Sequence, residues 1–141
     1  MAVPTDVNSP LNSPSHTGEH QRVSDALATL NPTWIALPLV NGWGNYGGSP
    51  SFELASYCKV NNFVYLQGLI ISGTSNTIFT LPVGYRPVRV HLGVLWNAGP
   101  NAVLRWDLSI GGVFTHSGAA PTATSHVLGL TGLFFSTTAL P

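Results

Sequence analysis

The chain has 141 residues, enough for one compact domain with an appendage, and its formal net charge is zero. Charged residues make up only 7% and hydrophobic residues 44%, whereas an ordinary soluble domain has about 25% charged residues. This composition excludes a basic nucleic-acid-binding surface, and the absence of a run of about 18 apolar residues excludes a membrane-inserted helix. We expect much of the surface to face other protein, because interface cores are poor in charge and rich in aromatic residues.

Residues 1–16 carry prolines among Ser and Asn, at Pro4, Pro10 and Pro14. Such a composition cannot bury a core of its own, so it predicts an extended arm that becomes ordered when it docks. The N-terminus also lacks the basic and apolar regions of a signal peptide. We therefore expect synthesis in the cytoplasm of the producing cell, without secretion through a signal peptide.

The end of this arm contains His16, Glu19 and His20 in the H-x-x-E-H spacing that some zinc peptidases place on a helix. Two imidazoles at this spacing can bind one Zn²⁺ while the glutamate acts as general base. A catalytic zinc takes a third protein ligand, however, and the arm offers none at a known spacing. We therefore expect a helix N-terminus, capped by Ser15 or Thr17, with no metal and no cofactor.

Apolar residues then recur at helical spacing over residues 17–30. Val23, Leu27 and Leu30 stand at i, i+4 and i+7, which predicts one short amphipathic helix. The helix is expected to end before Pro32, because the residue that precedes a proline is pushed out of the α region.

From Trp34 onward the apolar residues alternate with polar ones in short runs broken by Gly, Asn and Pro, which is typical of a β-sandwich or barrel. The runs 52–60 and 63–71 flank Asn61-Asn62, which predicts a type I′ hairpin. Further strands are expected at residues 77–81, 88–96, 102–110, 113–116 and 126–136. The sequence thus predicts an all-β, antiparallel, jelly-roll-like sandwich over residues 34–141, preceded by an arm and one short helix over residues 1–33.

Several of these strands are apolar on both faces. One face of the run 88–96 consists of Val88, Val90, Leu92, Val94 and Trp96. This face belongs either to the core or to an interface with another chain. A strand needs two apolar faces when one packs inside the sandwich and the other against a neighbouring subunit. We therefore expect copies of the chain to assemble with closed symmetry.

Residues with reactive side chains are few and scattered. The single Cys58 is expected to be a small buried strand residue, and His91, His116 and His126 to be hydrogen-bonded side chains. The motifs of common catalytic sites are absent, and the C-terminal hundred residues hold only Glu53 and Asp107 as carboxylates. We expect no enzymatic activity. A shallow saccharide platform remains an alternative, built from Trp43, Tyr46, Trp96 and Trp106.

Two motifs carry a resemblance to a known group of proteins. The segment "NGWGNYGGSPSFELASYCKVNNFVYLQGLIISG" and the later "FTLPVGYRP" resemble the C-terminal modules of bacteriophage minor tail, tail fibre and head fibre proteins. Those modules have a Trp-rich opening, a "Y.KV.N.VYL.G" hairpin and a "LP.GYRP" turn. The positions that match are Trp43, Tyr57, Lys59, Val60, Asn62, Val64, Leu66, Gly68, Leu81, Pro82, Gly84, Tyr85, Arg86 and Pro87.

The resemblance implies a homotrimeric β-sandwich exposed on the surface of a phage particle, with an N-terminal part that binds other virion proteins of the tail or capsid. Residues assigned to this anchoring part are Pro4, Pro10, Leu11, Pro14, Val23 and Leu27. Residues assigned to contact with a host cell-surface glycan or protein are Trp43, Tyr46, Tyr85 and Arg86. A tail-tip protein and a capsid decoration or head fibre protein both fit this resemblance. The chain lacks the long shaft that a fibre normally has.

Overall fold

The structure, a computed structural model, describes residues 21, 22, 25, 31–47, 52–71, 73–118 and 126–139. The chain divides into two compact units, residues 1–32 and 33–141, and each is described by itself.

Little of the first unit belongs to the described residues. Gln21, Arg22 and Asp25 are helical, and Gln21 Nε2 donates a hydrogen bond of 2.7 Å to Asp25 Oδ1. The rest of the predicted helix and the arm lie outside the described residues. The same holds for the anchoring candidates Pro4, Pro10, Leu11, Pro14, Val23 and Leu27, and for the histidine-rich helix entry.

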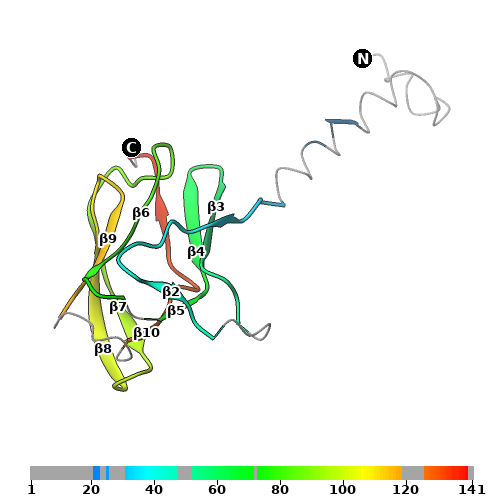
Figure 1. Ribbon diagram of the computed structural model, residues 1–141. Coiled ribbons are helices and arrows are strands. Elements are labelled where there is room, and N and C mark those ends of the chain that lie inside the picture. Colours follow the sequence, from blue (N-terminus) through cyan, green and yellow to red (C-terminus); the bar gives the residue numbers. More distant parts are fainter. Residues whose placement is uncertain are drawn as a thin grey trace, which may run out of the picture. The chain divides into compact units, whose positions relative to one another are not determined.

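Strands are the regular secondary structure in the described part of the second unit, and they pair into two antiparallel sheets (Figure 1). The four-stranded sheet has the order β1-β3-β4-β11, and the seven-stranded sheet has the order β2-β5-β10-β7-β8-β9-β6. The strands of the first sheet are β1 (Ile35–Ala36), β3 (Ser56–Val60), β4 (Phe63–Gln67) and β11 (Phe134–Ser136). Those of the second are β2 (Gly44–Asn45), β5 (Leu69–Ile71), β6 (Thr77–Thr80), β7 (His91–Asn97), β8 (Ala102–Leu108), β9 (Val113–Ser117) and β10 (Val127–Gly129). The predicted all-β antiparallel sandwich is confirmed.

The hairpin predicted around Asn61-Asn62 forms between β3 and β4, with Val60 opposite Phe63. Its turn differs from the prediction. Asn61 has a positive φ of 54°, whereas Asn62 does not, and a type I′ turn needs positive φ at both positions.

Two segments predicted as single strands are each divided between the sheets. Residues 63–71 form β4 in one sheet and β5 in the other, and residues 126–136 likewise form β10 and β11. Gly68 separates the first pair of strands and has a φ of 107°, which non-glycine residues rarely adopt. The chain therefore crosses from sheet to sheet twice along segments whose hydropathy pattern is continuous.

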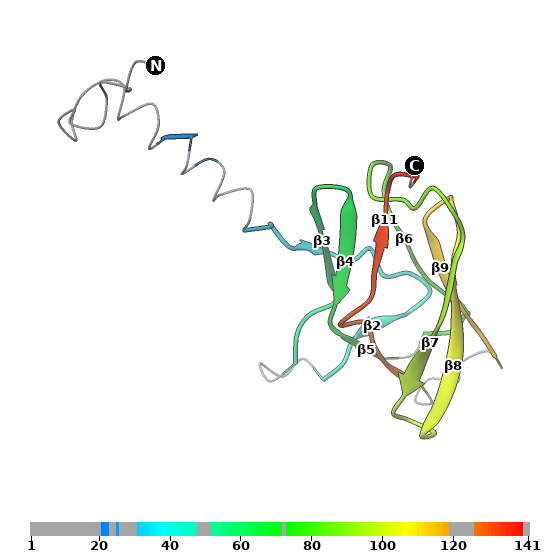
Figure 2. The same cartoon turned by 180° about the vertical axis from the view of Figure 1, so that it is seen from behind.

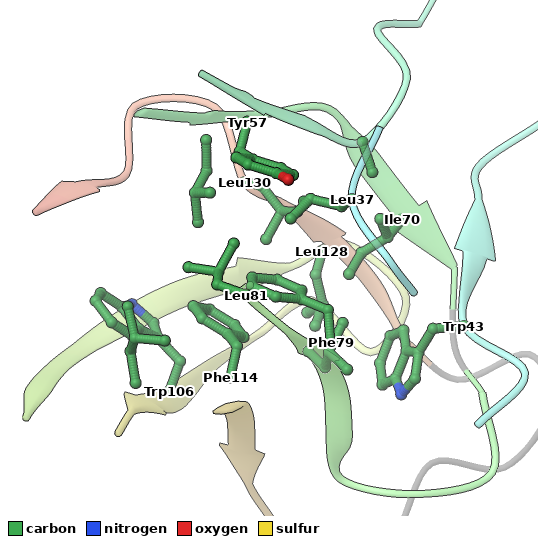
Figure 3. Close-up of a cluster of buried hydrophobic side chains, with 14 of the residues drawn as sticks. Leu37, Trp43, Tyr57, Ile70, Phe79, Leu81, Trp106, Phe114, Leu128 and Leu130 are labelled. Atoms are coloured by element: carbon green, nitrogen blue, oxygen red, sulfur yellow. The ribbon is translucent and has the colours of Figure 1, made fainter. Parts of the chain in front are cut away.

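A single apolar core fills the space between the sheets (Figure 3). At its centre the ring of Phe114 stacks on Phe79 and on Trp106, with centroid distances of 4.7 Å and 5.2 Å. Trp106 in turn lies against Gly93, where an added Cβ would come within 2.6 Å of the indole ring. The other buried apolar side chains of the core are Leu37, Trp43, Ala55, Tyr57, Val64, Leu66, Ile70, Ile78, Leu81, Leu95, Leu108, Leu128, Leu130 and Phe135.

The apolar face predicted along residues 88–96 is not part of this core. Its side chains are between 45% and 68% exposed. The members are Val88, Val90, Leu92, Val94 and Trp96. Of the two alternatives for this face, a place in the core is therefore wrong, and an interface with another chain remains as the prediction. No helix among the described residues is long and apolar enough to cross a membrane.

Candidate functional site

The two crossings between the sheets meet at one corner of the sandwich. Leu130 N donates a hydrogen bond of 2.9 Å to Gly68 O, and Gly68 N donates one of 3.1 Å to Thr131 Oγ1. A Cβ on Gly68 would lie 2.5 Å from backbone atoms of Ala55. The corner therefore requires glycine at position 68, both for its φ and for the close approach of the neighbouring backbone.

A hollow of about 480 Å³ opens at this corner, which we call the corner hollow. It is lined by Phe52, Glu53, Gly68, Leu69, Gly129 and Thr131. Glu53 is held on both sides, because Leu69 N donates to its carbonyl oxygen at 3.2 Å and Thr131 Oγ1 lies 3.4 Å from its Oε2. The volume lies in the range of about 300–1,000 Å³ that small-molecule sites occupy.

An aromatic pair stands beside the corner hollow. Tyr46 N donates a hydrogen bond of 2.9 Å to Leu69 O, which fixes Tyr46 next to the lining. The rings of Tyr46 and Phe52 pack edge to face with centroids 5.4 Å apart, and Phe52 is 46% exposed. A carboxylate, a hydroxyl and the ring of Phe52 thus line one concave surface, and the ring of Tyr46 packs against Phe52. This set can accept and donate hydrogen bonds while packing an apolar ligand face against a ring.

Of the four residues predicted to contact a receptor, only Tyr46 lies at the corner hollow. Trp43 is 5% exposed, and its Nε1 donates a hydrogen bond of 2.8 Å to Ser75 O. Tyr85 packs on Tyr57 with centroids 4.9 Å apart, and burial and Tyr85 raise the pKa of Tyr57. The structure does not bring the four residues together.

Arg86 lies in the turn "LPVGYRP", and its side chain forms a hydrogen bond within the same chain. Its Nε donates a hydrogen bond of 2.8 Å to Leu81 O. Lys59 Nζ donates one of 2.8 Å to Gly84 O, so the hairpin motif is tied to the turn motif. Both cations thus satisfy backbone carbonyls in a structural turn.

The tryptophans of the alternative saccharide platform also do not form one surface. Trp43 and Trp106 are buried, whereas Trp96 is 54% exposed. An exposed aromatic cluster does exist elsewhere, on the outer face of the four-stranded sheet, where β4 pairs with β11 (Figure 2). There Phe134 lies 5.9 Å from Tyr65 and 6.3 Å from Phe63, measured between ring centroids.

Sequence reasoning missed Phe52, Glu53 and Thr131. The alternation predicts a strand from residue 52 onward, whereas residues 52–55 belong to the loop before β3. Thr131 comes close to Glu53 only because the chain crosses between the sheets at both Gly68 and Leu130. No local pattern signals such a meeting of distant segments.

A buried histidine pair lies within the second unit. The rings of His116 and His126 are 5.0 Å apart, and Trp43 packs edge-on to both at 5.7 Å and 6.4 Å. Neither ring nitrogen of His116 has a hydrogen-bond partner in the described part of the chain, contrary to the prediction. Burial, together with His126, lowers the pKa of His116, and burial lowers that of His126.

This pair predicts a loss of stability in acid. An unfolded histidine titrates at about pH 6.5, so above that pH both states are neutral and the folded state keeps its full stability. As the pH falls from 6.5 through the lower folded pKa, the unfolded state binds more protons and gains stability. We expect the urea midpoint to fall between pH 7 and pH 5, and to fall less in His116→Gln. An equal slope in both proteins would contradict this role of His116.

The described residues contain no group of three or more His, Cys, Asp or Glu side chains that could hold a metal ion. Cys58 is buried, as expected, and burial raises the pKa of its thiol. The ring of His91 packs 5.9 Å from that of Phe135.

By its architecture the described part of the second unit is an antiparallel two-sheet sandwich with a concave surface at one corner. The structure of the chain is similar to the crystal structure of the receptor binding protein (gp15) of Listeria phage PSA, with a TM-score of 0.62 and 18% sequence identity. The similarity covers 94% of this chain and 83% of that one. At this identity it shows a shared fold. No protein-family model matches the chain, and no curated protein sequence does.

Proposed function

We propose that the chain is a non-catalytic structural protein of a bacteriophage particle, displayed at the tail tip as a homotrimer and used in attachment to the host cell. The observation that carries this proposal is the fold shared with a phage receptor binding protein over 94% of the chain. The hairpin and turn motifs that resemble phage tail and fibre modules support it independently. In this proposal residues 1–33 anchor the β-sandwich to other virion proteins.

Electron microscopy of particles with a labelled C-terminus tests the location. Label at the tail tip is the expected result. Label spread over the head would contradict the tail assignment and support the alternative, a capsid decoration or head fibre protein. Particles without label would contradict both.

We further propose that the corner hollow is the surface that contacts the host, and that it takes a saccharide. Sugars present hydroxyl groups in the ring plane and apolar C–H groups on the ring face. Glu53 and Thr131 offer hydrogen-bonding groups, while Phe52 and Tyr46 offer ring faces and edges beside them.

Two substitutions in the hollow are expected to weaken attachment without unfolding the chain. Glu53→Gln removes a charged hydrogen-bond acceptor, and Phe52→Ala removes an exposed ring. Losing a hydrogen bond to a charged group costs about 1.5–3 kcal/mol, so we expect at least about a tenfold loss of affinity. Binding of fluorescently labelled protein to host cells measures this effect.

Phe134→Ala is the matched control for Phe52→Ala, because it removes an exposed ring from the other surface. It is expected to keep the affinity of the wild-type protein. If Phe134→Ala reduces binding while both hollow variants bind normally, the receptor surface lies on the four-stranded sheet instead.

A further inference from the structure

The outward side of the hairpin formed by β7 and β8 carries an apolar stripe that runs along β7 and extends onto β8 at Val103. We call it the β7–β8 face and define it by Leu92, Val94 and Trp96 of β7 and Val103 of β8. These side chains are 60%, 68%, 54% and 59% exposed. In the sheet register Trp96 stands opposite Val103, so the two apolar side chains adjoin at the turn end of the hairpin.

Exposed and buried residues alternate along both strands, so the orientation of the exposed side chains is fixed by the burial of their neighbours. On β7 the inward residues Leu95 and Asn97 are buried, while on β8 the inward residues Trp106 and Leu108 are buried. The hairpin is thus fixed to the core by one side. Its other side leaves its apolar side chains in water.

The face is large for a chain of this size. Its four side chains together expose on the order of 400 Å², comparable to the largest apolar patch of a typical monomer, and such patches mark interaction sites. A standard interface buries about 800 Å² on each partner, with an apolar centre and a polar border. The β7–β8 face supplies about half of that area.

The border of the face carries one charge of each sign. Arg105 stands opposite Val94 and Asp107 opposite Leu92, and Arg105 Nε lies 2.9 Å from Asp107 Oδ1. Because these two charges balance, the face does not attract a strongly charged partner electrostatically. A second copy of the same face presents the same neutral pair, so two copies meet without like-charge repulsion and their arginines and aspartates can exchange partners.

We propose that the β7–β8 face is covered by another copy of this chain, and that it forms the subunit interface of the homotrimer; this rests on the oligomer in the proposed function. A stripe that runs along a three-fold axis meets its two symmetry copies there, and each copy covers the others.

Sedimentation of the full chain with Val94→Asp tests the interface. In a protomer this carboxylate stands in water opposite Arg105, whose charge is already balanced by Asp107. In the trimer each copy would therefore bury one unbalanced negative charge beside those of the other two copies. We expect the dissociation constant of the trimer to rise at least about 100-fold, because burying an unpaired charge at an interface costs several kcal/mol. Val83→Asp is the matched control, since Val83 is 80% exposed and lies on the turn before β7. It is expected to remain trimeric.

A second measurement does not depend on the folding of Val94→Asp. The difference in acrylamide quenching between the wild-type protein and Trp96→Phe reports on Trp96. We expect Trp96 to be shielded at trimer concentrations and accessible after dilution. If the wild-type protein is trimeric with Trp96 accessible, or if Val94→Asp remains trimeric, the β7–β8 face is not the subunit interface. The homotrimer itself is not contradicted by either result. A monomeric wild type overturns both the interface and the homotrimer, while leaving the tail location and the corner hollow to their own tests.

Discussion

Phe114→Ala is expected to lower the free energy of unfolding by about 3–5 kcal/mol, the range measured for removing buried aromatic rings. The ring of Phe114 is fully buried between Phe79 and Trp106 and stacks on both. Its removal leaves a cavity between β6, β8 and β9 that these rigid neighbours cannot fill. A loss of this size approaches the whole stability of a small domain, so the variant should be partly unfolded at 37 °C.

Urea unfolding followed by circular dichroism measures the loss, and Phe134→Ala is its control. Phe134 is also a strand phenylalanine with an aromatic neighbour, but it is 60% exposed. We expect Phe134→Ala to cost less than about 1 kcal/mol. If the two variants lose similar stability, the core does not centre on the stack of Phe114.

The strands could be predicted from the sequence because alternation is a local property. The hairpin at Asn61 and the strands β6, β7, β8 and β9 accord with period-two runs and turn residues. The assignment of strands to the two sheets could not be predicted from this alternation. The pattern of residues 63–71 does not change at Gly68, where the chain leaves one sheet for the other.

Alternation also fails to tell a core from an exposed interface. Val94 and Leu95 are adjacent and both apolar, yet one is 68% and the other 5% exposed. For Trp43 the error is the opposite, because a residue expected to be exposed is buried. Its Gly- and Asn-rich surroundings suggest an exposed loop, whereas its ring is buried against the histidine pair and its Nε1 is satisfied by a backbone carbonyl.

The candidate site was the least predictable feature, because it arises from topology. Its lining comes from the loop before β3, the crossing at Gly68 and the segment after β10. The sequence points to Tyr46 through its aromatic ring alone, and the place of Tyr46 beside the hollow depends on a backbone hydrogen bond to Leu69. Periodicity carries no information on contacts between segments this far apart in sequence.

Gly68→Ala is expected to be the most damaging of the small substitutions. The φ of 107° is strained for any residue with a Cβ, and here the new Cβ would lie 2.5 Å from the backbone of Ala55. Backbone cannot rotate away as a flexible side chain does. Relief of the clash would move the crossing, with loss of the hydrogen bonds from Gly68 N to Thr131 and from Leu130 N to Gly68 O. We expect a loss of more than about 4 kcal/mol, a size that marks a specific structural break.

Gly132→Ala separates the effect of the positive φ from the effect of the steric clash. Gly132 also has a positive φ, of 94°, but the Cβ of an alanine at this position would meet no atom beyond its chain neighbours within 4 Å. The variant should show only the backbone penalty, about 1–2 kcal/mol. Urea midpoints of the two variants and the wild-type protein give the comparison. Equal losses would mean that φ alone makes glycine necessary at position 68 and that the corner tolerates a methyl group. A much larger loss in Gly68→Ala would show that the sheets are joined there by close backbone contact, and the same contact holds Glu53 and Thr131 in place around the corner hollow.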